Sequence, residues 1–201
     1  MLCVVSLSKT DGRLSRSLRS RAAVAEALLA LIEEGDLRPT APRIAARAGV
    51  SLRLVFHHFK DLEAVFADAS KREIERVVPS LKQVPASGPL EPRIEAFIGE
   101  RSRLLERVFT MWRAASLQEP FSPEISKHMK MIRAWLRDDT ERVFAKELEK
   151  LRGADKTEML TTLHAVTSMG AWKDLRLHQD LSLDKARRAS VRAVSSVLKK
   201  R

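Results

Sequence analysis

The sequence predicts an all-α protein, in which an N-terminal three-helix domain with a helix-turn-helix joins a C-terminal helical domain. Apolar residues recur at intervals of three to four along most of the 201 residues, and no stretch shows the alternation of a strand. Only 7 glycines and 8 prolines are present, which favours long helices. Two short helices separated by Gly49 have the spacing of a helix-turn-helix.

We place the first domain in residues 1–60, with residues 1–12 as a disordered arm, and the second domain in residues 61–201. Residues 79–92 hold four prolines and one glycine and form the clearest linker.

The N-terminal elements follow from apolar spacing and capping residues. An amphipathic helix is predicted over residues 16–34, where Leu18 begins the apolar stripe and Gly35 ends the helix. Thr40 is suited to cap a short helix over residues 41–47, and Ser51 to cap a third over residues 52–58.

Five further helices are expected in the rest of the chain. Asp61 is the expected cap of the first of them, because a short acidic side chain stabilises a helix N-terminus. Their predicted ranges are 61–78, 91–117, 123–151, 155–178 and 182–199.

The formal charge of +11, from 37 basic and 26 acidic residues, indicates either a polyanionic partner or simple solubility. Nearly half of this excess lies in the first 60 residues. The single cysteine, Cys3, excludes an internal disulfide framework and a cysteine-based zinc cluster. No signal segment and no uncharged stretch of about 20 residues is present, so we expect a cytoplasmic protein with no membrane partner.

No catalytic constellation is found, and we expect neither an enzyme nor a bound cofactor or metal. Asp138 and Asp139 are adjacent on a predicted helix, so their carboxylates point in different directions. No pair of histidines has the helical spacing of a metal site.

A longer pattern surrounds the two short helices. It consists of Ala27-Leu28-Leu29 and Glu34-Gly35, followed by Thr40-Ala-Pro-Arg-Ile-Ala-Ala-Arg-Ala-Gly-Val-Ser51, Val55-Phe-His-His-Phe59 and Asp61-Leu-Glu-Ala-Val65. This pattern resembles the N-terminal domain of TetR-family transcriptional regulators. It covers about 50 residues, and the remaining chain matches only in length, helix number and domain order. The resemblance implies a homodimeric DNA-binding repressor whose second domain binds a small effector that changes the separation of the two DNA-reading heads.

The chain departs from the family pattern at two positions. Phe56 stands where the family usually has a tyrosine, and this protein contains no tyrosine. Leu62 stands where the family usually has a lysine. Both family residues usually contact DNA phosphates, so their loss weakens binding without changing base choice. Lys60 and His57 are the candidates to compensate.

The predicted DNA contacts lie on the two short helices. Arg53 is early in the second one, where a guanidinium can donate to guanine O6 and N7. Thr40 and Arg43 begin the first one, where free N–H groups bind anions. Arg13, Arg16 and Arg19 form either a minor-groove arm or a flexible basic tail, whereas His58 and Phe59 are expected to pack. The predicted DNA-binding set is Thr40, Arg43, Ser51, Leu52, Arg53, Phe56, His57 and Lys60.

Large adaptable side chains in the second domain favour an apolar effector cavity, although such residues at helical spacing are more often core. Arg101 falls on the apolar face of its predicted helix, between Ile98 and Leu105. A half-buried arginine there needs a partner, which is either an acidic ligand or a nearby acidic side chain. The predicted effector set is Arg101, Phe109, Trp112, Arg113, Met129, Trp135, His164, Met169 and Trp172.

Small residues on the last helix allow either a dimer contact through the last two helices or ordinary packing within one chain. They are Ala186, Ala189, Ser190 and Ala193.

Two functions from different classes remain open. The first is a transcriptional regulator that binds an operator in double-stranded DNA and is released by a small, mostly apolar effector. The second is a helical small-molecule-binding protein with weakened or lost operator recognition, which Phe56 and Leu62 motivate.

Overall fold

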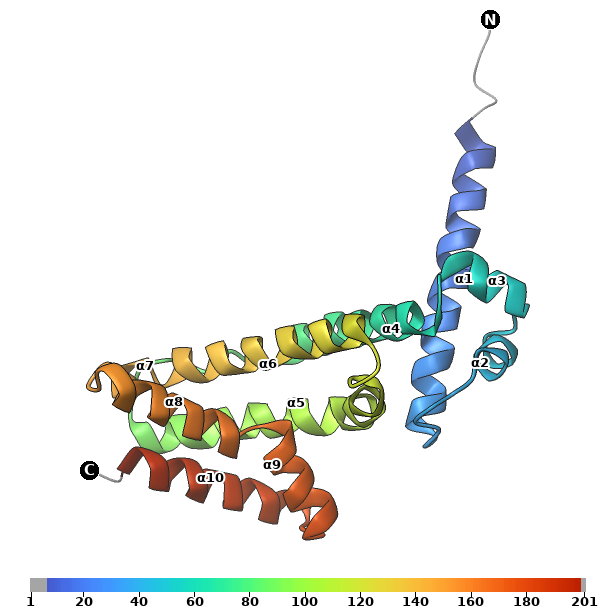
Figure 1. Ribbon diagram of the computed structural model, residues 1–201. Helices are drawn as coiled ribbons and strands as arrows, with labels where there is room; N and C mark the ends of the chain where they lie inside the picture. The colour runs from blue at the N-terminus through green and yellow to red at the C-terminus, as the bar shows by residue number, and fades with distance from the viewer. Residues whose placement is uncertain (1–6, 200–201) are drawn as a thin grey trace, which may run out of the picture. The chain divides into compact units, whose positions relative to one another are not determined.

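The computed structural model describes residues 7–199, and all regular secondary structure in that range is helical (Figure 1). The elements are α1 (Leu7–Glu33), α2 (Ala41–Ala48), α3 (Leu52–His58), α4 (Leu62–Val77), η1 (Val78–Ser80), α5 (Leu90–Gln118), α6 (Pro123–Val143), α7 (Ala145–Leu148), α8 (Gly153–Val166), α9 (Met169–Lys173), η2 (Asp174–His178) and α10 (Leu183–Lys199).

The chain forms two compact units. The first contains the residues up to Glu75 together with Thr110–His128, and the second contains Arg76–Phe109 together with Met129 onwards. The first unit is therefore discontinuous in sequence, whereas the predicted boundary lies between residues 60 and 61.

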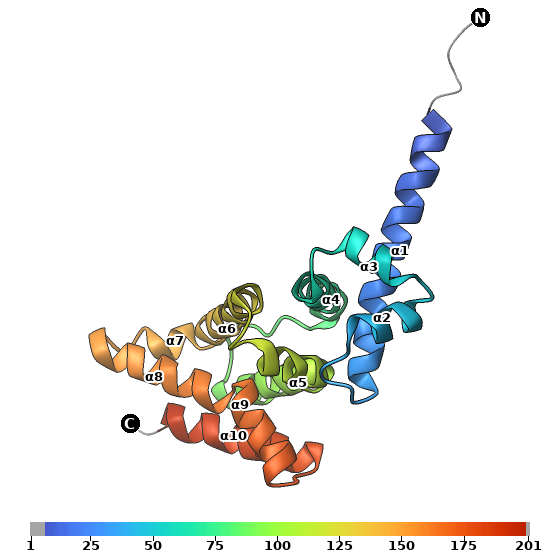
Figure 2. The same cartoon turned by 45° about the vertical axis from the view of Figure 1, so that its right-hand side comes forward.

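In the first unit, α1 packs against α2 and α3 (Figure 2). The apolar face of α1 is buried over its last three turns, from Val24 to Ile32. Ile44 of α2 and Val55 of α3 are also fully buried. From the second segment of this unit, Ser122 Oγ donates a hydrogen bond of 2.7 Å to Glu63 Oε2 of α4.

The turn between α2 and α3 depends on Gly49. Its φ of 65° is in the left-handed region, which residues with a side chain rarely adopt. The N–H of Gly49 bonds to Ala46 O and that of Val50 to Ala45 O, the pattern of a Schellman motif. Gly35 ends α1 in the same way, with a φ of 97°.

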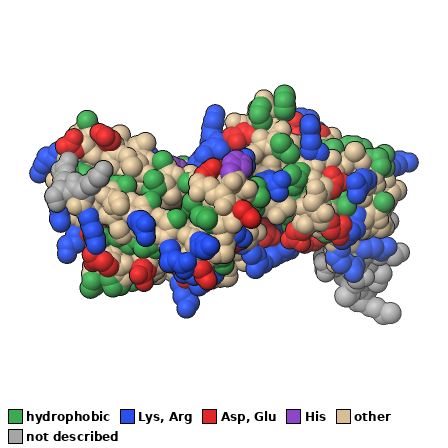
Figure 3. All heavy atoms as spheres, turned by 90° about the horizontal axis from the view of Figure 1, so that it is seen from below, with side chains coloured by type: hydrophobic (Ala, Val, Ile, Leu, Met, Phe, Trp, Pro, Cys, Tyr) green, Lys and Arg blue, Asp and Glu red, His purple; other side chains and the backbone are tan. Residues whose placement is uncertain are grey.

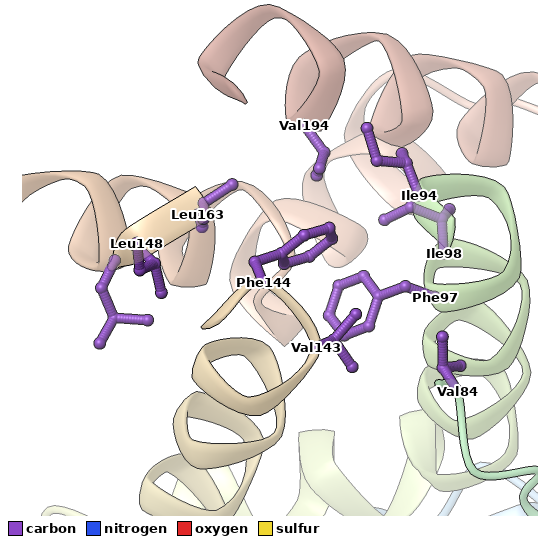
Figure 4. Packing of buried hydrophobic residues seen from close by; sticks show 10 residues of the cluster. Val84, Ile94, Phe97, Ile98, Val143, Phe144, Leu148, Leu163 and Val194 are labelled. Atoms are coloured by element: carbon purple, nitrogen blue, oxygen red, sulfur yellow. The ribbon is translucent and has the colours of Figure 1, made fainter. Parts of the chain in front are cut away.

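In the second unit, the core is built by α5, α6, α7, α8 and α10 (Figure 4). Phe97 and Phe144 meet edge to face at its centre, with ring centroids 5.1 Å apart and planes at 77°. Such aromatic pairs add about 0.5–1.5 kcal/mol beyond their buried area. Ile94, Leu163 and Val194 pack around this pair.

The first helix is longer than predicted. The disordered arm expected over residues 1–12 is wrong for residues 7–12, which belong to α1, while residues 1–6 lie outside the described range. No proline interrupts this stretch, so the helix propagates through it. Leu18, predicted to lie on the buried stripe, is 58% exposed.

Two predicted helices of the second unit are broken. The predicted helix over 123–151 is interrupted at Phe144, where φ is −106° and ψ is 20°, and the buried Phe144 ring packs into the core. The predicted helix over 155–178 is interrupted at Thr167. Its hydroxyl donates to Leu163 O at 2.7 Å, and the Ser168 hydroxyl begins α9 by accepting from Ala171 N.

Among the described residues, no helix is both long enough and apolar enough to cross a membrane. On the face shown in Figure 3, the lysine and arginine side chains are scattered among acidic and apolar ones.

Candidate functional site

The short helix α3 is fixed by its cap and by two buried anchors. The Ser51 hydroxyl accepts a hydrogen bond of 3.2 Å from Leu54 N, as predicted for an N-cap. Val55 and Phe59 are buried, and the Phe59 N–H bonds to Val55 O at the other end. The orientation of α3 is therefore set by packing on one side, which leaves its opposite face to solvent.

The opposite face of α3 presents Leu52, Arg53, Phe56 and His57. Leu52 is 41% exposed and Phe56 is 49% exposed, so two apolar side chains belong to this solvent-facing side. Arg53 and His57 are exposed and form no ion pair with the described residues. Lys60, just beyond α3, lies 3.9 Å from Asp61 Oδ2, and its side chain is almost wholly in solvent. This face offers cationic donors beside an exposed aromatic ring.

At the N-terminus of α2, one of the predicted contact residues is already paired with an acidic side chain. Thr40 occupies the N-cap position with an extended backbone, but its hydroxyl makes no capping hydrogen bond. Arg43 pairs with Asp36, with 2.9 Å between Nη1 and Oδ2. Arg47 is exposed and forms two hydrogen bonds with Glu34. These bonds are the main cause that lowers the pKa of Glu34.

Arg21 anchors the end of α3, a role that sequence reasoning missed. Its Nη1 donates to the carbonyl of His58 at 3.2 Å, and its Nε donates to Asp68 Oδ1 at 3.0 Å. The guanidinium also lies 4.5 Å from the centroid of the Phe59 ring. Arg21 therefore connects α1 with the end of α3 and with α4.

The carboxylate of Asp68 receives two arginines, because Arg72 also donates to it at 2.7 Å. Burial would raise the pKa of Asp68, but the hydrogen bonds from Arg72 and Arg21 outweigh it and lower the pKa. The sequence gives little indication of this cluster, because 47 residues separate Arg21 from Asp68.

His58 packs behind the exposed face, as predicted. Its ring is half-buried and meets the ring of His57 edge to face, with centroids 5.4 Å apart. Burial, followed by the charges of His57 and Arg21, lowers the pKa of His58. The neutral imidazole is therefore favoured behind the exposed face.

The predicted effector residues do not gather in one place. Trp112 and Arg113 belong to the first unit, whereas the other seven belong to the second. Within the second unit, only Arg101 and Trp135 line the larger cavity. Arg101 and Trp172 also border a space of about 10 Å³, which holds little more than one water molecule. The predicted second-unit residues that line neither space are Phe109, Met129, His164 and Met169.

The larger cavity has a volume of about 310 Å³ and lies between residues 78–84, α5 and α6. Small-molecule sites in proteins range from roughly 300 to 1,000 Å³, so this cavity suits a small ligand. Its apolar lining includes Phe97, Leu104 and Trp135. Its charged lining consists of Lys82, Glu100, Arg101, Asp139 and Arg142.

Arg101 is deeply buried, with 3% of its side chain exposed. Its Nη2 lies 3.1 Å from Asp139 Oδ2 and donates to Leu136 O at 3.0 Å. The acidic partner required at this position is thus Asp139, on α6. Burial lowers the pKa of the Arg101 guanidinium, and the carboxylate of Asp139 opposes that shift.

Asp139 is shared between two arginines, because Arg142 Nη2 also donates to its Oδ1 at 2.8 Å. Asp138 is exposed and takes no part in this cluster. Among the side chains that the structure describes, no three His, Cys, Asp or Glu residues are placed to hold a metal ion.

Glu106 forms a second polar cluster that the sequence did not indicate. Its Oε1 accepts 2.8 Å hydrogen bonds from Trp172 Nε1 and from Arg176 Nε. Trp172 is therefore a buried side chain with a satisfied donor. His164 is half-buried, and burial, followed by the charges of Arg101, Arg137 and Arg133, lowers its pKa.

The small residues of α10 pack within the unit at two of the four positions. Ala186 and Ser190 are buried together with Val194, whereas Ala189 and Ala193 are more exposed. Ala186 and Ser190 therefore show the second of the two predicted alternatives, which is packing within one chain.

Curated relatives match part of the chain. No protein-family model matches the sequence. The HTH-type transcriptional regulator BetI of Escherichia coli is 34% identical over 88 residues, which is 42% of this chain and 45% of BetI. The chain thus matches less than half the length of this relative.

Solved structures match nearly the whole chain. A transcriptional regulator from Rhodococcus sp. Rha1 has a TM-score of 0.68 at 20% identity, covering 91% of this chain and 96% of its own. A TetR/AcrR-family regulator from Thermobifida fusca has a TM-score of 0.61 at 21% identity, covering 90% and 97%. SmeT, solved in complex with triclosan, has a TM-score of 0.60 at 17% identity, covering 88% and 90%. The chain therefore has the all-helical fold of the TetR/AcrR-family transcriptional regulators.

Proposed function

We propose that the protein is a transcriptional regulator that binds operator DNA through α2 and α3. The observation that carries this proposal is the exposed face of α3, where Arg53, Phe56 and His57 stand outward on a helix fixed by Ser51 and Val55. In a helix-turn-helix, the second helix enters the major groove and its N-terminal residues reach base edges. Arg53 is the residue of this face best suited to read guanine.

The regulator acts as a homodimer, because two recognition helices must meet half-sites on one face of the DNA. The exposed Leu177 and Leu183, near the start of α10, support a contact through the C-terminal helices. Light scattering of the purified protein tests this directly, and a monomer at micromolar concentration contradicts it.

A small effector releases the operator by binding the second unit. The cavity of about 310 Å³ supports this step, as does the complex of SmeT, a protein of the same fold, with triclosan. An effector that binds one conformation more tightly shifts the population toward it. The regulation is repression, and it takes place in the cytoplasm, where the operator DNA lies.

The test is a fluorescence anisotropy titration with duplex DNA from the region flanking the gene and with a random duplex of equal length. The expected result is preferential binding of the flanking DNA, with affinity falling steeply between about 50 and 200 mM salt. Equal affinity for both duplexes overturns the operator-binding proposal. Arg53→Ala is the matched variant, because Arg53 has no ion-pair partner among the described residues whose loss would unfold α3.

The second candidate is a ligand-binding protein that has lost operator recognition. Phe56 and Leu62 favour it, because neither side chain can donate a hydrogen bond to a phosphate. In that case Arg53→Ala leaves expression of the neighbouring genes unchanged in the cell. A change in their expression supports the regulator instead.

A further inference from the structure

The cavity of the second unit has one apolar side and one charged side. Phe97, Leu104 and Val84 supply buried apolar surface, and Trp135 stands at the wall with 42% of its surface exposed. An exposed tryptophan at the wall of a cavity is suited to cover an apolar ligand. The body of a ligand in this space is therefore apolar.

The charged side is organised around a shared carboxylate. Asp139 lies between Arg101 and Arg142, with N–O distances of 3.1 Å and 2.8 Å. The other acidic residue of the lining, Glu100, is paired with Arg103 at 2.8 Å and also accepts from the backbone N–H of Lys82. The two arginines at Asp139 exceed its charge by one, and Lys82 adds a further cation to the lining.

One hydrogen-bond donor of Arg101, which lines this cavity, is left over. Arg101 donates from Nη2 to Leu136 O, Asp139 Oδ2 and Thr140 Oγ1, while its Nη1 is buried without a hydrogen-bond partner among the described residues. A buried guanidinium nitrogen without an acceptor is costly, so an acceptor brought by a ligand gains a charge-assisted hydrogen bond.

From this arrangement we propose that the cavity binds a small amphipathic monocarboxylate. The carboxylate accepts from Arg101, and the apolar body lies against Phe97, Leu104 and Trp135. The lining holds three cations, Lys82, Arg101 and Arg142, and two carboxylates, so its charge of +1 matches a monoanion better than a dianionic group such as a phosphate monoester. The inference rests on the proposed function only in treating this cavity as the effector site.

The test uses four probes with one apolar chain and different head groups: octanoate, octanol, octylammonium and octyl phosphate. Binding to the full chain is measured by tryptophan fluorescence and by calorimetry, without DNA. Octanoate is expected to bind about 10-fold or more tightly than octanol, the gain of one charge-assisted hydrogen bond. Equal or tighter binding of octanol or octylammonium overturns the proposal, as does tighter binding of octyl phosphate. The absence of any octanoate binding also overturns it.

Two variants locate the site. Arg101→Met removes the guanidinium and is expected to reduce the preference for octanoate over octanol to less than about 2-fold, from the loss of that hydrogen bond. Trp135→Phe is expected to remove most of the fluorescence change, and calorimetry follows the octanoate binding that this variant retains. A fluorescence change that persists in Trp135→Phe places the ligand elsewhere and contradicts the assignment.

Arg137→Met is the matched control for Arg101→Met, because it removes one positive charge from α6 at a position that does not line the cavity. It is expected to keep the preference for octanoate. Because the four-probe comparison uses the unsubstituted protein, it decides the proposal even where Arg101→Met fails to fold.

The two proposals fail separately. Binding of octanoate without any operator binding leaves the ligand assignment intact and refutes the regulator. Operator binding without binding of octanoate refutes the ligand assignment and leaves the regulator intact.

Discussion

Arg53 on α3 of the first unit and two buried arginines of the second unit are used in opposite ways. On α3 of the first unit, Arg53 is exposed and forms no ion pair with the described residues. In the second unit, Arg93 and Arg101 each expose only 3% of their side chains and are held by Glu147 and Asp139. A free surface guanidinium contributes little to stability but is available to a polyanion. A buried one fixes the elements around it, so Arg53 is left available to a partner, whereas Arg93 and Arg101 hold the architecture of the second unit.

The largest expected effect is on the stability of the second unit. Arg93 donates to Ala86 O at 2.7 Å and to Val143 O, and its guanidinium pairs with Glu147. Arg93→Met leaves these acceptors without their donor, which is expected to cost about 3–5 kcal/mol of unfolding free energy. Urea denaturation followed by circular dichroism measures the loss. A cost below about 1 kcal/mol, the range of an exposed ion pair, removes the contrast between buried and exposed arginines.

The second effect is on DNA binding and not on stability. Arg53→Ala is expected to weaken operator affinity by about 1–3 kcal/mol, because a guanidinium contact to a base is lost. The free energy of unfolding is expected to stay within about 0.5 kcal/mol of that of the unsubstituted protein. Anisotropy and urea denaturation on the same sample check both parts, and a loss of stability equal to the loss of affinity refutes the division of roles.

A smaller gain is expected from Phe56→Tyr. The ring is 49% exposed, so the added hydroxyl fits without disturbing the core. It restores a donor for a DNA phosphate, and we expect affinity to rise by about 1 kcal/mol with no change in base preference. Titrations against the flanking and random duplexes check this, and both affinities should increase by a similar factor. Phe56→Leu is the control without a hydroxyl.

The smallest effect concerns pH. Burial lowers the pKa of His58 in the first unit and of His164 in the second below the usual 6.5. The unfolded chain then binds protons more readily than the folded protein does. The contribution of these two histidines to the free energy of unfolding is therefore complete above about pH 6.5, and it declines as the pH falls toward their lowered pKa values. Urea denaturation at about pH 7.5 and about pH 5.5 should show lower stability at the lower pH. Between these two pH values, His164→Gln should lose less unfolding free energy than the unsubstituted protein. An equal loss would mean that His164 does not contribute to the pH dependence.

The helix-turn-helix was predictable because its determinants are local. Ser51 caps α3, Asp61 Oδ1 accepts from Ala64 N at 2.8 Å to cap α4, and Gly49 supplies the left-handed turn, all within a few residues of one another. The predicted all-helical fold with an N-terminal helix-turn-helix is confirmed. It was predictable for the same reason.

Contacts between distant residues were not predictable. The core phase of Arg101 showed that it needed a partner, but only the fold brings Asp139 to it across 38 residues. The break at Phe144 arises where its ring is buried in the core against Phe97, and the periodicity of the sequence continues through it. The effector residues were predicted from their size, yet size does not decide which side of a helix faces a cavity. Trp135 and Arg101 line the larger cavity, and the other predicted positions of the second unit do not.

The discontinuity of the first unit has a consequence for how such proteins exchange parts in evolution. A recombination event that transfers only the first 60 residues separates Phe66 and Ala69 of α4 from the helices that precede them. It also leaves behind Thr110–His128, including Ser122, whose hydroxyl bonds to Glu63. A chimaera that carries both segments keeps these contacts. The inheritable module is therefore a pair of sequence segments, and swapping the helix-turn-helix alone is expected to yield a poorly folded hybrid.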